Sequence, residues 1–390
     1  MKKIQDLSLS GKRVFVRVDF NVPMENGRVQ DDLRIQMALP TIEYLMEQGA
    51  RIILCTHMGR PKGERQEKFS LAPVAEHLST LINKKVTLAP DCIGPEVEAS
   101  IQQMQNGDVL MLENVRFYKQ ETENDPQFAQ QLGALAEVYI NDAFAVSHRA
   151  HASVVGVAGV IEDKAPGFLL QRELDYFQRS IDTPIRPLVA IVGGAKVSGK
   201  LQALENMLNR VDRLILGGAM ANTFLKSQGY DVGASLVEDD LVDTASALLK
   251  QASEKGVKVY LPVDVVAAEK FENEAVSKQV TIQDIPDQWM ALDIGPASVL
   301  YFTEALDEAK TIVWNGPMGA FEMDAFSRGT MAIAHTVAAS HALSVTGGGD
   351  SNAAIKKAGE ADNISYMSTG GGAFLMLMEG KELPGVLALQ

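Results

Sequence analysis

Short apolar stretches alternate with amphipathic stretches along the whole chain. Residues 13–19 predict a strand, because Val14, Val16 and Val18 recur with the period of two that places side chains on one face. Residues 33–48 predict a helix with one apolar stripe. The same alternation restarts after residue 187, with strands expected at residues 188–192 and 213–216. Strands and helices that alternate in this way form parallel sheets whose faces are covered by the helices. The sequence therefore predicts an α/β fold with two doubly wound, Rossmann-like parallel sheets.

The length of the chain favours two domains, because 390 residues exceed what one hydrophobic core usually holds. A proline-containing break at residues 183–187 interrupts the alternation, and we place the domain boundary there. In doubly wound folds, ligands bind beyond the carboxyl ends of the strands, in the loops that lead into helices. Functional residues are therefore expected in the loops that follow the predicted strands.

Composition excludes several classes of partner. The net charge of −14 argues against nucleic acid and against an anionic membrane surface. The longest apolar runs, such as residues 154–161, are too short to cross a bilayer, and no secretory signal is evident at the start. Cys55 and Cys92 have no spacing typical of a disulfide or zinc framework. These features fit a reducing cytoplasm.

Eleven of the fifteen arginines lie within the first 185 residues. A guanidinium binds phosphate or carboxylate through paired hydrogen bonds. Each polar residue at a strand end could instead serve a structural ion pair, and the arginine excess could be a solvated surface. Because these residues follow successive strands, we favour an anion pocket. The candidates for it are Asp19, Asn21, Arg34, His57, Arg60, Arg116 and Arg149.

The second half carries glycine-rich turns that could bind phosphate through backbone N–H groups at helix starts. Residues 194–201 nearly match the P-loop signature, but Leu201 stands where that motif requires Ser or Thr for magnesium. We therefore reject a P-loop and keep the phosphate interpretation, in which Lys196 and Lys200 face one polyphosphate. The alternative is a tight turn with two solvated lysines.

A second glycine turn follows a predicted strand at residues 346–351. Gly348 and Gly349 allow close approach of a ligand, and Ser351 lies at the same helix start. Asp350 could give magnesium one carboxylate, although an aspartate there is more often a helix cap. Glu322, in another loop after a strand, could accept hydrogen bonds from ribose hydroxyls, but most loop glutamates are merely solvated.

No catalytic base is evident, and His148 and His151 lack partners at zinc-binding spacing. A carboxylate that accepts a phosphoryl group is already deprotonated at neutral pH and needs no base. Such a transfer requires positioning and stabilisation of charge. The residue pattern thus fits phosphoryl transfer between two bound anions.

Several motifs along the whole chain, in the same order, resemble the phosphoglycerate kinase family. The tail at residues 379–386, with the sequence Glu-Gly-Lys-Glu-Leu-Pro-Gly-Val, is similar too. Two other interpretations remain: a P-loop ATPase, against which Leu201 speaks, and a noncatalytic two-domain binding protein, whose usual export signal is missing. The motifs that carry the resemblance lie at residues 16–23, 141–144, 148–153, 193–198, 314–317 and 347–351.

The resemblance implies an enzyme that moves the acyl phosphate of 1,3-bisphosphoglycerate to ADP, reversibly and with Mg²⁺, giving 3-phosphoglycerate and ATP. It implies a cytoplasmic monomer whose carboxyl-terminal tail returns to the first domain. Residues 1–170 and 377–390 would form the phosphoglycerate-binding domain, residues 171–186 an interdomain helix and hinge, and residues 187–376 the nucleotide-binding domain.

The resemblance also assigns roles to single residues. Arg34 and Lys196 would act in catalysis, and Asp350 would bind the metal. The phosphoglycerate would be held by Asp19, Asn21, Arg34, His57, Arg60, Arg116 and Arg149. The nucleotide would be held by Lys196, Lys200, Glu322, Gly348, Gly349, Asp350 and Ser351.

Overall fold

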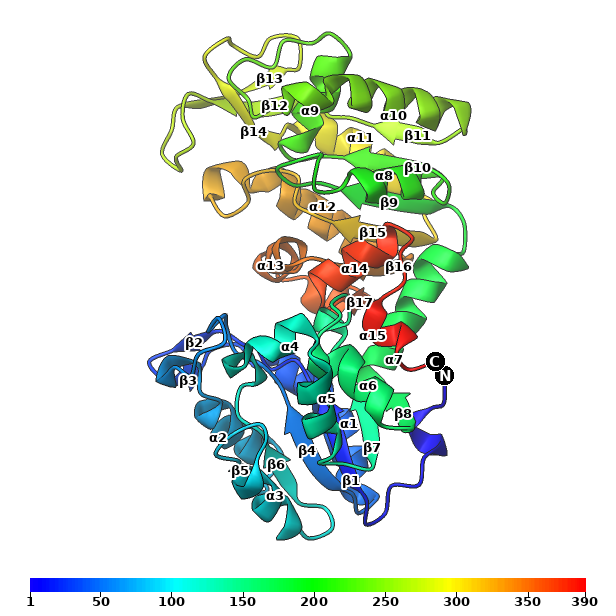
Figure 1. The fold of residues 1–390 in the computed structure, drawn as a ribbon. Helices are drawn as coiled ribbons and strands as arrows, with labels where there is room; N and C mark the ends of the chain where they lie inside the picture. The colour runs from blue at the N-terminus through cyan, green and yellow to red at the C-terminus, as the bar shows by residue number, and fades with distance from the viewer. The chain divides into compact units, whose positions relative to one another are not determined.

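The structure, a computed structural model, describes residues 1–390 and contains two compact units (Figure 1). Unit 1 comprises Met1–Leu174 and Glu382–Gln390, and unit 2 comprises Asp175–Lys381. Each unit is built on a six-stranded sheet in which every neighbouring pair of strands is parallel. This confirms the predicted α/β fold with two parallel sheets. None of the helices combines the length and apolar character that a membrane-spanning segment needs.

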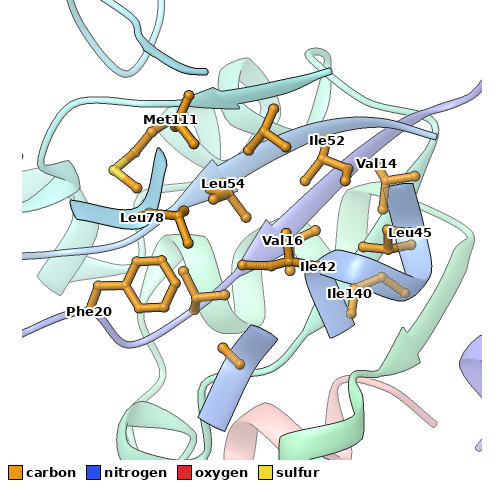
Figure 2. Packing of buried hydrophobic residues seen from close by; sticks show 14 of the residues in the cluster. Val14, Val16, Phe20, Ile42, Leu45, Ile52, Leu54, Leu78, Met111 and Ile140 are labelled. Carbon is orange, nitrogen blue, oxygen red and sulfur yellow. The ribbon is translucent and has the colours of Figure 1, made fainter. Parts of the chain in front are cut away.

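The sheet of unit 1 is apolar on both faces, as expected for parallel strands covered by helices. Val16 lies in register with Leu54 on one side and Ile140 on the other. Helix α1 (Leu33–Glu47) packs Ile42 and Leu45 against this face (Figure 2). The strands, in sheet order, are β5 (Val86–Leu88), β6 (Val109–Met111), β4 (Arg51–Cys55), β1 (Arg13–Arg17), β7 (Val138–Asn141) and β8 (Asp163–Pro166).

Helices connect these strands and cover the sheet (Figure 1). A two-stranded hairpin, β2 (Met24–Glu25) and β3 (Arg28–Val29), follows β1, and α7 (Phe168–Phe177) crosses the division between the units. The other helices of unit 1 are α1 (Leu33–Glu47), α2 (Ala72–Leu81), α3 (Pro95–Gln102), α4 (Lys119–Glu123), α5 (Pro126–Gly133), α6 (Val157–Val160) and α15 (Pro384–Leu387).

Unit 2 repeats the architecture. Two of its strands have the bounds that the apolar runs predicted, at residues 188–192 and 213–216. In sheet order the strands are β11 (Lys258–Tyr260), β10 (Arg213–Leu216), β9 (Leu188–Val192), β15 (Thr311–Asn315), β16 (Leu343–Thr346) and β17 (Tyr366–Met367). The helices are α8 (Leu201–Met207), α9 (Met220–Ser227), α10 (Val242–Glu254), α11 (Pro296–Leu306), α12 (Arg328–Ala339), α13 (Gly349–Lys357) and α14 (Gly371–Met378).

Unit 2 also contains a three-stranded antiparallel sheet that the sequence analysis missed. Its order is β13 (Ser277–Thr281), β12 (Asp264–Ala268) and β14 (Met290–Ile294). The outer strand β13 is polar and largely exposed, so it lacks the apolar run by which the buried strands were recognised. Two strands of this sheet, β12 and β14, supply lining residues to a pocket of the unit.

Candidate functional site

The predicted anion-binding residues of unit 1 gather at one edge of its sheet. Strands β6, β4, β1 and β7 are neighbours and all run parallel, so their carboxyl ends meet at the same edge. The loops after these four strands carry every candidate except Arg34, which lies in the first turn of α1. In loop order the other candidates are Asp19 and Asn21, His57 and Arg60, Arg116, and Arg149. We call these residues, with Arg34, the basic cluster.

Arg34 is fixed at one edge of its guanidinium group. Its Nη1 donates to Asp19 Oδ2 at 2.9 Å and to the backbone oxygen of Asn21 at 3.0 Å. Asn21 Oδ1 accepts the backbone N–H of Gly59 at 2.9 Å, which joins the loops after β1 and β4. The Arg34 side chain remains 36% exposed. The guanidinium is thus oriented by one nitrogen and can offer its other donors to an anion.

Arg116 occupies an environment that favours an added negative charge. Its Nη1 donates to the backbone oxygen of Gly59 at 2.8 Å, while its buried Nε has no hydrogen-bond partner. Burial, together with the charges of Arg17 and Arg149, lowers the pKa of Arg116 to about 10. An anion bound beside this guanidinium would offset the repulsion among the cations. Arg60, next to Gly59 in the chain, is exposed.

A buried polar network under the basic cluster was missed by the sequence analysis. The Arg17 side chain is fully buried, and its Nε donates to Ser153 Oγ at 2.7 Å. Ser153 Oγ in turn donates to Glu121 Oε1 at 2.7 Å. Arg17 Nη2 lies 3.3 Å from His57 Nδ1. A charged residue at the end of a strand expected to be buried was the available signal, because such a charge must be paired when it leaves water.

In unit 2, a pocket of about 470 Å³ opens at the carboxyl ends of β9, β10 and β15. The loops after β9 and β10 touch closely: a Cβ atom on Gly218 (φ +67°) would lie 2.5 Å from Gly194 N, so only glycine fits there. The antiparallel sheet supplies apolar lining residues, and the exposed Glu322 and Asp350 also line the pocket. Most of the lining is apolar: Ala195, Ala219, Leu236, Val265, Met290, Ile294 and Met318.

Asp293 is a further polar group in this pocket, and sequence reasoning did not identify it. Its carboxyl group accepts the backbone N–H of Gly329 at 2.7 Å and that of Ile294 at 2.9 Å. Burial raises the pKa of Asp293 to about 7, and these hydrogen bonds oppose the shift. Asp293 is therefore partly protonated at neutral pH, unlike an ordinary exposed aspartate.

The two lysines of the glycine loop lie in different environments. Lys200 Nζ is directed inward and donates to the backbone oxygens of Gly193 at 2.6 Å and Asn315 at 3.0 Å. Burial lowers the pKa of Lys200 to about 8, and the charge of Asp350 opposes the shift. Lys196 is exposed, and the neighbouring residues 197 and 198 donate to the carboxylate of Glu238. Because α8 begins only at Leu201, the two lysines do not share a helix.

The start of α13 offers backbone donors beside Lys200. The cap position is Gly348, and Asp350 lies in the first turn, so the alternative in which Asp350 caps the helix is wrong. Ser351 Oγ is buried, accepts the backbone N–H of Gly316 at 2.6 Å and donates to the backbone oxygen of Gly347 at 3.0 Å. A ligand contact from Ser351 therefore requires its backbone N–H. The exposed carboxylate of Asp350 remains available to a ligand.

Comparisons with known proteins agree with this architecture. The family model described as phosphoglycerate kinase matches residues 4–381. A phosphoglycerate kinase of Desulfotalea psychrophila is 66% identical over 391 residues and covers 100% of both chains. One from Geobacter metallireducens is 59% identical over 384 residues, covering 98% of this chain and 96% of the relative.

Solved structures give the same result. The structure of phosphoglycerate kinase from Coxiella burnetii has a TM-score of 0.91 at 43% identity and covers 100% of this chain and 98% of its own. That from Pyrococcus horikoshii has a TM-score of 0.85 at 33% identity, with the same coverage. These matches confirm the predicted enzyme class, a nucleotide-binding kinase of glycolysis. The chain belongs to the phosphoglycerate kinase family.

Proposed function

We propose that unit 1 binds the phosphoglycerate through the basic cluster and that unit 2 binds the nucleotide in its pocket. The reaction would transfer the acyl phosphate of 1,3-bisphosphoglycerate to ADP, reversibly, giving 3-phosphoglycerate and ATP. The observation that supports this assignment of ligands to units is the contrast between the two sites. Unit 1 holds guanidinium groups at adjoining strand ends, whereas unit 2 holds an apolar pocket beside a buried lysine and a helix start.

In unit 1, the arginines would balance the charges of a small anion that carries both phosphate and carboxylate. The fixed orientation of Arg34 by Asp19 and Asn21 suits a residue that contacts the reacting end, because its remaining donors keep one direction. Arg116, whose charge is crowded by Arg17 and Arg149, suits the phosphate end. Arg60 and Arg149, which are exposed, would pair with the anion from the solvent side.

In unit 2, the apolar part of the pocket would hold the base and Glu322 would accept hydrogen bonds from the ribose. Lys200 and the backbone N–H groups of Gly349, Asp350 and Ser351 would hold the phosphates, helped by the positive end of the α13 dipole. Gly348 would let the phosphates approach the backbone. Lys196, exposed at the loop tip, would approach the transferred phosphoryl group.

The residues present also fit a Mg²⁺ ion carried by the nucleotide. No cluster of three or more His, Cys, Asp or Glu side chains could hold a metal by itself. Mg²⁺ is commonly bound through one or two carboxylates together with substrate phosphates and water. Asp350 supplies one such carboxylate at the pocket. When bound, the ion would neutralise charge on the phosphates.

A coupled assay with 3-phosphoglycerate and Mg-ATP tests the proposed reaction. We expect formation of the acyl phosphate to require both substrates and to stop when a chelator removes Mg²⁺. Hydrolysis of ATP at the same rate without 3-phosphoglycerate would instead indicate an ATPase. That outcome would overturn the proposed acceptor.

The lowered pKa of Lys200 predicts a pH dependence of nucleotide binding. Below about pH 8 the free protein carries the charged amine that pairs with phosphate, and above it the amine is neutral. ADP affinity should therefore fall as pH rises above 8, by up to about tenfold per pH unit. Calorimetry at several pH values measures this. An arginine side chain stays charged throughout this pH range, so ADP affinity of the Lys200→Arg variant should not fall above pH 8. An equal fall in ADP affinity in both proteins would contradict the prediction.

Direct transfer requires that the two bound ligands come into contact. It also requires that water be excluded, because water near an acyl phosphate would hydrolyse it. We propose that residues 171–186 act as a hinge, absorbing the dihedral changes of a closing motion. Small-angle scattering should give a smaller radius of gyration with both ligands bound than with either one. Equal radii in an active enzyme would contradict the hinge.

A further inference from the structure

Arg17 and His57 meet in the interior of unit 1. Arg17 ends β1, His57 follows the neighbouring strand β4, and the two residues are 0% and 3% exposed. Arg17 Nη2 lies 3.3 Å from His57 Nδ1. A guanidinium has donors but no acceptor, so Nδ1 must accept this hydrogen bond and carry no proton. In a neutral imidazole the proton then belongs to Nε2.

The competing partner for His57 Nδ1 is Asp19. Its Oδ1 lies 3.7 Å from Nδ1, beyond the range of a hydrogen bond. Both oxygens of Asp19 are also engaged, because Oδ2 accepts from Arg34 at 2.9 Å and Oδ1 accepts from the backbone N–H of Asn21 at 3.3 Å. A proton on Nδ1 would face the Arg17 donor and leave two buried donors opposed, which is unfavourable.

The direction of the Arg17 guanidinium is set by other partners. Its Nε donates to Ser153 Oγ at 2.7 Å, and its Nη1 donates to the backbone oxygen of Val18. Because a guanidinium is planar and rigid, each of these contacts restricts where Nη2 points, so the loss of one leaves the other in force. His57 therefore meets a donor that is already oriented.

His57 is also kept neutral. Burial, followed by the charges of Arg17, Arg116, Arg34 and His151, holds its pKa well below the ordinary value of 6.5. The carboxylate of Asp19 is the negative group nearest to the ring nitrogen. A neutral ring has a single N–H, so the tautomer decides whether His57 offers an anion a donor or a lone pair.

We propose that Arg17 is a positioning residue that fixes the Nε2–H tautomer of His57, so that His57 presents a hydrogen-bond donor to the bound phosphoglycerate. The inference rests on the proposed function of the basic cluster. With the opposite tautomer, the Nε2 lone pair would face the anion and repel it. Arg17 thus acts on substrate through His57 without contacting the substrate itself.

The tautomer can be measured without substrate, so it is tested independently of the proposed function. In full-length protein labelled with ¹⁵N-histidine, long-range ¹H–¹⁵N correlation spectra distinguish protonated from bare ring nitrogens. The His57→Gln variant assigns the resonance among the six histidines. We expect a bare, hydrogen-bonded Nδ1 and a protonated Nε2. A protonated Nδ1 in the unmodified protein would overturn the proposal, whatever the variants show.

Arg17→Lys tests the consequence for binding. A single ammonium cannot reach both Ser153 and His57, so the tautomer should become mixed and 3-phosphoglycerate should bind about 10- to 100-fold more weakly. Turnover at saturating 3-phosphoglycerate and ADP affinity should stay nearly unchanged, and ADP affinity also reports that the variant is folded. An Arg17→Lys variant with unchanged tautomer and unchanged affinity would contradict the positioning role.

Ser153→Ala is the control within the same buried network, because it removes the Nε contact of Arg17 but leaves the Nη1 bond to Val18 and the Nη2 donor beside His57 Nδ1. It should keep the Nε2–H tautomer and most of the 3-phosphoglycerate affinity. If it weakened binding as much as Arg17→Lys, a general loosening of the network would explain both effects. If the tautomer changed in Arg17→Lys without a loss of affinity, His57 would not be a phosphoglycerate donor.

Discussion

Replacing Arg34 with alanine should lower kcat by about 10³- to 10⁵-fold, because an arginine that stabilises a transferring phosphoryl group typically contributes that much. The side chain lies at the start of α1 and is held in one orientation by Asp19 and Asn21. Because the side chain is 36% exposed, we expect the variant to keep its fold. The measurement is steady-state turnover at saturating concentrations of both substrates, with circular dichroism to check folding.

Two further variants sharpen this experiment. Arg34→Lys keeps the positive charge but loses the planar guanidinium, so its turnover should lie between that of the unmodified protein and that of Arg34→Ala. Arg28→Ala, an exposed position on β3 nearby in sequence, should leave turnover unchanged. A folded Arg34→Ala variant with normal turnover would remove Arg34 from the mechanism.

Glu121→Gln should destabilise unit 1 by about 3–5 kcal/mol, because it leaves the Arg17 charge buried without its counter-charge. Glu121 and Arg17 are both fully buried, with Glu121 Oε1 and Arg17 Nη2 4.0 Å apart and Ser153 bridging them. Burial raises the pKa of Glu121, but nearby His151, the Arg17 charge and the Ser153 hydrogen bonds outweigh it and lower the pKa below 4.5. Glu121 is thus ionised in the folded protein.

Chemical denaturation and thermal melting measure this effect, and we expect Tm to fall by roughly 6 °C or more. Glu123→Gln on the same short helix is the control, because its side chain is exposed and its loss should cost less than about 0.5 kcal/mol. Because the pKa of Glu121 is lowered on folding, its stabilising contribution is present above pH 4.5 and lost as pH falls through the folded value. The difference in Tm between Glu121→Gln and the unmodified protein should therefore shrink in acid. If Glu121→Gln and Glu123→Gln had equal Tm values at pH 7, the prediction would be contradicted.

The fold was predictable where buried strands appear in the sequence as apolar runs. Strand β9 is a continuous apolar run, and β10 is an apolar run preceded by Arg213; the bounds of both were predicted to the residue. Strand β1 ends at Arg17 and not at Asp19 as expected, because the apolar alternation continues through Val18 into the loop. The antiparallel sheet was missed because β13 pairs through its backbone and has polar, exposed side chains.

The candidate site was predictable where topology alone brings residues together. Parallel strands share one carboxyl edge, so residues at successive strand ends had to meet there. Sequence could not show which lysine is buried, because that depends on the carbonyl groups of Gly193 and Asn315, which are far apart in the chain. It also could not separate Arg17 from a solvated arginine, since its partners Ser153 and His57 come from distant segments.

The division of ligands between the two units is the central claim, and calorimetry of four variants with both ligands tests it most directly. Lys200→Ala and Asp350→Asn should weaken Mg-ADP binding and leave 3-phosphoglycerate binding nearly unaffected, because the changed groups line the pocket of unit 2 or lie beside it. Arg60→Ala and Arg149→Ala should do the reverse, because both lie at the sheet edge of unit 1. If the two unit 2 variants lost 3-phosphoglycerate and kept Mg-ADP, the assignment of ligands to units would be wrong.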